Sequence, residues 1–178
     1  MERNIEILMG IFGAIWGLTG VLLLLGSAIY RLSHWAIDAF SYPFSWYHWA
    51  SLFLVLLFMA FAEGYRGFQK AFSPRVAARA LYLKNHPKVL HALLAPFFCM
   101  GFFYASKRRK ITSFSVTSAI IVLIVLVRLL SQPWRGIIDA GVVVGLLWGL
   151  ISLIIFSIQA FTSKDFTYSP EVPQEDQR

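Results

Sequence analysis

Long apolar runs with almost no charged side chains are the feature that most constrains this chain. A helix of about 20 apolar residues crosses the roughly 30 Å hydrocarbon core of a bilayer. The chain has 178 residues, of which 58% are hydrophobic and 14% charged, and these values lie outside the range of soluble domains. The sequence therefore predicts an all-α fold, a polytopic membrane helical bundle, because backbone polar groups inside a bilayer must be paired within the chain.

We predict one transmembrane domain over residues 1–161, followed by a disordered cytoplasmic tail at 162–178 that is polar and rich in proline and acids. The connector at 31–45 mixes apolar and polar side chains, which favours a short helix at the membrane interface. Four transmembrane helices are expected, over about 5–30, 46–65, 112–130 and 137–161.

Glycines recur at helical spacing in the first and last spans. Gly13 and Gly17 form a small-xxx-small pair, and Gly141, Gly145 and Gly149 form a longer ridge. Such patterns let another helix approach closely, so both faces are predicted to be helix-packing surfaces. The alternative for the first span is a glycine face that lines a pore or a ligand.

A basic segment follows the second span. Ser73 and Pro74 are typical of a helix start, with serine as the cap and proline at the first helical position. We expect an amphipathic helix over 74–85 that lies on the membrane surface. Its Arg75 and Arg79 are predicted to contact anionic lipid headgroups; the sharper alternative is a binding site for an anion or phosphate ligand.

The third apolar run, 89–106, is short and lies between two basic flanks. A full crossing would place one flank on the translocated side, against the positive-inside rule. We therefore favour a re-entrant hairpin bent near Pro96, with a plain short crossing as the alternative.

The formal charge of +7 is concentrated beside the apolar runs, mainly at 66–88 and 107–110. The positive-inside rule and anionic lipids explain this placement, so no nucleic-acid partner is predicted. With both basic blocks on the inner side, the N- and C-termini are expected to be cytoplasmic. The predicted location is a bacterial inner (cytoplasmic) membrane.

Charged residues within spans are candidate functional groups, because they are costly in a bilayer. Glu63 and Arg66 lie three residues apart on one helix face and are expected to pair. Arg128, Arg135 and Asp139 flank the turn between the last two spans. We expect them to cluster and pin this hairpin; a proton or ion relay is the alternative.

No cofactor, metal site or catalytic residue is predicted. The four histidines are expected at two different membrane depths, which does not suit a bis-histidine haem. The single cysteine, Cys99, excludes an intramolecular disulfide. No nucleophile elbow, HExxH or Walker loop is present, so the sequence supports no enzymatic activity.

These observations favour a non-enzymatic structural or accessory protein. We expect it to pack with itself or with a larger membrane complex through the glycine faces of its first and last spans. The alternative function is a small transporter or channel for ions or small solutes, and the third is a lipid-modifying membrane enzyme. Membrane lipids are the remaining expected partners.

Overall fold

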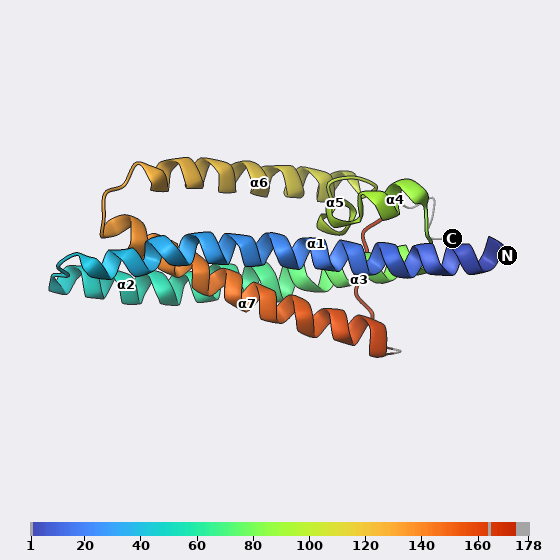
Figure 1. Ribbon diagram of the computed structural model, residues 1–178, viewed down its shortest axis with the longest axis horizontal. Coiled ribbons are helices and arrows are strands. Elements are labelled where there is room, and N and C mark those ends of the chain that lie inside the picture. Colours follow the sequence, from blue (N-terminus) through green and yellow to red (C-terminus); the bar gives the residue numbers. More distant parts are fainter. Residues whose placement is uncertain (1, 164, 174–178) are drawn as a thin grey trace.

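The computed structural model describes residues 2–163 and 165–173, and this part of the chain is helical, with no strand (Figure 1). The 3-10 turn η1 follows the first helix, and η2 is a π-helix between two α-helices. The elements are α1 (Glu2–Asp38), η1 (Ala39–Ser41), α2 (Trp46–Met59), η2 (Ala60–Phe72), α3 (Ser73–Asn85), α4 (Val89–Leu93), α5 (Ala95–Met100), α6 (Lys107–Arg128) and α7 (Trp134–Thr162).

Four helices are long and apolar enough to cross a membrane: Asn4–Ser41, Trp46–Asn85, Lys107–Arg128 and Trp134–Thr162. The prediction of a multi-pass helical bundle is confirmed. Figure 1 shows the start of α1, the end of α3 and the short helices α4 and α5 at one end of the molecule, which we call the basic end. The turns after α1 and α6 lie at the opposite end.

The second span continues through η2 into α3 as one helix from Trp46 to Asn85, so the predicted break at Ser73 and Pro74 is wrong. Proline inside an α-helix clashes with the carbonyl four residues earlier. The π-helix ends at Phe72, directly before Ser73, and its wider hydrogen-bond spacing gives the ring room. Likewise, α1 continues to Asp38 instead of ending before a separate interfacial helix.

The helix α3 is a core element and does not lie on the membrane surface. Its residues Val76, Ala80 and Leu83 are all 0% exposed. They pack with α1, α5 and α7 in a single apolar cluster. The predicted amphipathic surface helix over 74–85 is therefore corrected: its apolar face packs against protein, and Arg79 on its polar face is buried as well.

The run 89–106 contains two short helices, α4 and α5, joined at Leu94. Helices of five and six residues are each too short to cross a bilayer; the choice between a re-entrant hairpin and a short crossing stays a prediction. The bend lies at Leu94, and Pro96 occupies the first turn of α5. A Cβ atom added at Gly20 of α1 would collide with Pro96. The short helices α4 and α5 thus fill the glycine face of α1.

The glycine ridge of α7 is also filled within the chain. Gly141, Gly145 and Gly149 are buried. The groove they form receives Val55 of α2 and Glu63 and Phe68 of η2. Small residues thus allow close helix contact, but the partner is this chain's own second span.

In contrast, α6 stands apart from the bundle (Figure 1). Arg109, Ser113 and Val127 are its buried residues, and they lie near its two ends. From Ile120 to Leu126 seven consecutive side chains are between 38% and 57% exposed. Seven residues cover every side of a helix, so the middle of α6 has no packed face.

Candidate functional site

Glu63 is a charged residue that the fold places against Gly145 of α7. It lies in the first turn of the π-helix η2, and π-helical segments are often found at functional sites. Its Oε2 atom would be 3.2 Å from a Cβ atom added at Gly145 of α7. Gly145 follows Trp134, the first residue of α7, by 11 residues. That spacing corresponds to roughly 16 Å of helix, about half the hydrocarbon thickness.

The expected ion pair between Glu63 and Arg66 is absent from the described part of the chain. Arg66 is exposed, and Glu63 is half-buried. Widening of the helix in η2 changes the angle between residues three apart, and this separates the two side chains. A carboxylate at this depth without a cation is costly when charged, so Glu63 is suited to hold a proton or to meet a cation from outside the chain.

A second acidic residue, Asp139, is 3% exposed near the opposite end of the bundle. Its Oδ2 atom lies 3.7 Å from Nε of Arg135. The Arg135 guanidinium stacks 3.6 Å above the Trp35 ring of α1. Arg128 is exposed and forms no ion pair among the described residues. The predicted cluster is thus Arg135 and Asp139 without Arg128, and it pins α7 to α1 and not to α6.

The Gln132 side chain adds hydrogen bonds to the same end. Its Nε2 donates to the Trp35 carbonyl at 3.1 Å and to Oδ2 of Asp38 at 3.0 Å, while its Oε1 accepts from the Gly136 amide at 3.0 Å. These bonds tie the turn before α7 to the end of α1. This arrangement is structural, because each polar atom of Gln132 binds a group of the protein itself.

Arg79 is buried, contrary to the expected contact with lipid headgroups; it is 1% exposed. Its guanidinium donates four hydrogen bonds to main-chain carbonyls, to Phe98 at 2.6 Å, Pro170 at 2.7 Å, and Phe103 and Tyr104 at 3.0 Å each. The Phe98 ring lies 4.2 Å from its Cζ atom. Carbonyl dipoles and an aromatic face replace the solvation that the cation loses.

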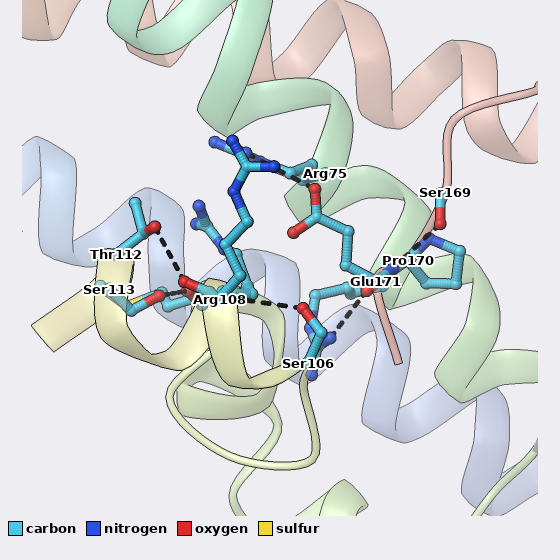
Figure 2. A network of polar contacts seen from close by, with 11 residues as sticks. Arg75, Ser106, Arg108, Thr112, Ser113, Ser169, Pro170 and Glu171 are labelled. Carbon is cyan, nitrogen blue, oxygen red and sulfur yellow. Dashed lines mark hydrogen bonds and ion pairs between the residues drawn. The ribbon is translucent and has the colours of Figure 1, made fainter. Parts of the chain in front are cut away.

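The C-terminal tail reaches this site and is part of the fold. The Ser106 amide donates to the Glu171 carbonyl at 3.0 Å, and the Glu171 carboxylate lies 3.6 Å from Arg75 (Figure 2). Val172 is 3% exposed within the core cluster. Residues 169–172 therefore correct the prediction of a disordered tail, and we call them the strap. Residues 174–178 of the predicted tail lie outside the described residues.

Both arginines that we expected at the lipid surface bind the strap instead. Arg75 pairs with Glu171, and Arg79 binds the Pro170 carbonyl. The strap also holds Ser106, which caps α6 by accepting from the Arg109 amide at 3.3 Å. One local signal for this contact is present in the sequence: Val172 is a single apolar residue in a polar stretch.

Histidines and the cysteine serve packing. His48 lies between Tyr47 and Trp134, with ring centroids at 4.2 and 4.8 Å. The described residues contain no group of three or more histidine, cysteine, aspartate or glutamate side chains able to hold a metal. Burial raises the pKa of the Cys99 thiol to about 12, so it stays protonated and weakly nucleophilic.

The chain matches no protein-family model and no curated protein, and no solved structure resembles it. The proposed function therefore rests on the geometry of the structure. Two of the features described above lack an internal partner among the described residues. One is the free middle of α6, and the other is the unpaired carboxylate of Glu63.

Proposed function

We propose that this protein is a non-enzymatic accessory component of a membrane complex, and that α6 is the helix that binds its partner. The main support for this proposal is that the middle of α6 is exposed on every side. Both glycine faces that we expected to bind a partner are filled by the chain itself. Among the four spans of the described residues, α6 is the one whose middle is exposed on every side.

The sequence of α6 supports this role. Ser115 and Ala119 form a small-xxx-small pair, and both residues are exposed. Membrane helices associate mainly through close packing of small residues and hydrogen bonds from serine and threonine, since lipid offers no hydrophobic driving force between them. Thr117 and Ser118 add hydroxyl groups to the same stretch. A second membrane helix, from another protein or another copy, fits this surface.

The proposed orientation places the basic end in the cytoplasm of a bacterial cell. Lys84, Lys88 and the block 107–110 lie at that end, as the positive-inside rule requires. Cysteine substitutions at Lys110 and at Phe40 should label from opposite sides of the membrane. Labelling from the same side would contradict the proposed orientation.

Site-specific photocrosslinking tests the partner helix. A photoreactive residue at Ser118 or Ile121 should give a discrete crosslinked protein band in membranes, because these side chains face the proposed partner. The matched control is Phe53 of α2, which is 62% exposed and should give only lipid adducts. Ala119→Leu should reduce the Ser118 crosslink by blocking close approach. Crosslinks that are equal at Phe53 and Ser118 would reject α6 as the binding helix.

Glu63 favours transport of protons or small cations as a second candidate function. Its carboxylate is half-buried, lies near mid-depth by the count above, and has no cation partner among the described residues. Carboxylates in such positions often mark ion pathways. In proteoliposomes, Glu63→Gln should then abolish flux while Asp139→Asn, whose carboxylate pairs with Arg135, should change it less. Flux that is unchanged by Glu63→Gln would remove this candidate.

A further inference from the structure

We infer that a groove between α1 and the ends of α3 and α7 binds one anionic phospholipid, with Lys84 holding the headgroup phosphate. The groove lies at the basic end and has a volume of about 310 Å³. Lys84 is the polar residue among the described residues that line this groove. The lining residues are Ile11, Ala14, Ile15, Leu18, Lys84 and Phe161.

The charge of the groove is positive, and its contact within the protein is with an aromatic ring. Lys84 forms no ion pair among the described residues, and its Nζ atom lies 5.4 Å from the Phe161 ring centroid. Arg75 and Arg79 are, in contrast, occupied by the strap and by main-chain carbonyls. An anionic group is therefore the complementary ligand for this position.

The backbone fixes the position of Lys84. A Cβ atom added at Gly10 of α1 would collide with the Lys84 carbonyl, so the two helices are in close contact there. Lys84 is the penultimate residue of α3, and lysine near a helix end places its ammonium group at the membrane interface. The cation is thus held at the depth of lipid phosphates.

The apolar wall runs inward from this cation. Ile11, Ala14, Ile15 and Leu18 have the spacing of one helix face, and they extend along α1 in the direction of the hydrocarbon core. The span from Ile11 to Leu18 measures roughly 10 Å. A phosphate at Lys84 and an acyl chain along this wall match the two parts of a phospholipid.

This inference is independent of the proposed partner of α6, because no groove residue belongs to that helix. It requires only that the protein spans a bilayer with its basic end at the headgroups. Loss of crosslinking at α6 would leave the lipid site intact, and loss of lipid binding would leave the partner proposal intact.

Native mass spectrometry of the full-length protein in mild detergent, titrated with phosphatidylglycerol or phosphatidylcholine, tests the site. We expect one phosphatidylglycerol molecule to bind more tightly than phosphatidylcholine. Lys84→Gln should lower phosphatidylglycerol affinity about fivefold, the effect of one lysine near a membrane surface, and should leave phosphatidylcholine unchanged. Lys84→Arg should retain the preference.

Two further variants distinguish a specific phospholipid site from general electrostatic attraction of anionic lipids to the basic end. Lys110→Gln removes an exposed lysine at the same end, outside the groove, and should change affinity by less than about twofold. Ile15→Trp fills the groove and should weaken binding of both lipids with Lys84 intact. Thermal unfolding of each variant in detergent reports its folding. The inference is overturned if Lys84→Gln binds like the wild type, or if Lys110→Gln weakens binding as much.

Discussion

Replacement of Arg79 by methionine should destabilise the protein and release the strap. The substitution keeps the side-chain length and removes the donors of four hydrogen bonds, to the carbonyls of Phe98, Phe103, Tyr104 and Pro170. The Phe98 carbonyl keeps the Gly101 amide as a donor at 3.0 Å, so three carbonyls lose their donor. Each carbonyl left without a donor costs about 1–3 kcal/mol, which gives a gross loss of about 3–9 kcal/mol.

Two effects reduce this loss. Methionine does not carry the desolvation penalty of a buried cation, which is several kcal/mol, and water at the basic end can bind some of the freed carbonyls. We therefore expect a net loss of about 3 kcal/mol, a large part of the 5–15 kcal/mol that keeps a typical domain folded. Arg79→Lys should recover little of it, since one ammonium group cannot reach carbonyls on three separate segments.

The assay is unfolding in detergent, combined with protease digestion of a C-terminal epitope tag. Arg79→Met should lower the unfolding midpoint and expose the tag to faster cleavage. The matched control is Arg75→Met, whose partner Glu171 lies at 3.6 Å with both side chains partly exposed; such a pair contributes at most about 1 kcal/mol. An equal unfolding midpoint for Arg79→Met and Arg75→Met would show that the hydrogen bonds from Arg79 to the carbonyls do not stabilise the fold. A wild-type midpoint for Arg79→Lys would show the same.

Three further outcomes follow from the packing. Gly145→Leu should cost about 1–3 kcal/mol because the new side chain meets Glu63, whereas Gly26→Leu, with open space around it, should unfold like the wild type. Cys99, with a thiol pKa of about 12, should resist maleimide at pH 8 and react only after denaturation; fast labelling of the native protein would contradict its burial. Folding raises the pKa of this thiol above its ordinary value of 9.0. The free energy of unfolding should therefore fall as pH rises from about 9 towards 12. Val172→Asp should free the C-terminal tag for proteolysis without changing span packing, and a protected tag would show that the strap is held elsewhere.

The sequence was informative where the physics is local. Hydrocarbon thickness sets the length of a spanning helix, so the four spans could be placed from apolar runs alone, although each helix extends beyond its apolar core. Glycine spacing indicated close helix contact at Gly145 and Gly17 because only a missing side chain permits it. The same spacing could not tell whether the partner was another chain or, as observed, the second span and the short helix α5.

Local signals failed where the backbone departed from α-helical spacing. Ser73 and Pro74 have the chemistry of a helix start, but the π-helix that precedes them accommodates the proline ring and the helix continues. No composition rule gives a 13-residue π-helix. The same change in spacing also separated Glu63 from Arg66, so one unrecognised element accounts for both wrong expectations.

The position of Arg79 could not be predicted because its partners carry no sequence signal. They are main-chain carbonyls 19 to 91 residues away along the chain, and every residue has such a carbonyl. An arginine four residues after Arg75 is typical of a solvated helix face, yet α5 and the strap close over it. The burial of this cation therefore depends on the strap, whose Pro170 carbonyl, and not a side chain, binds Arg79.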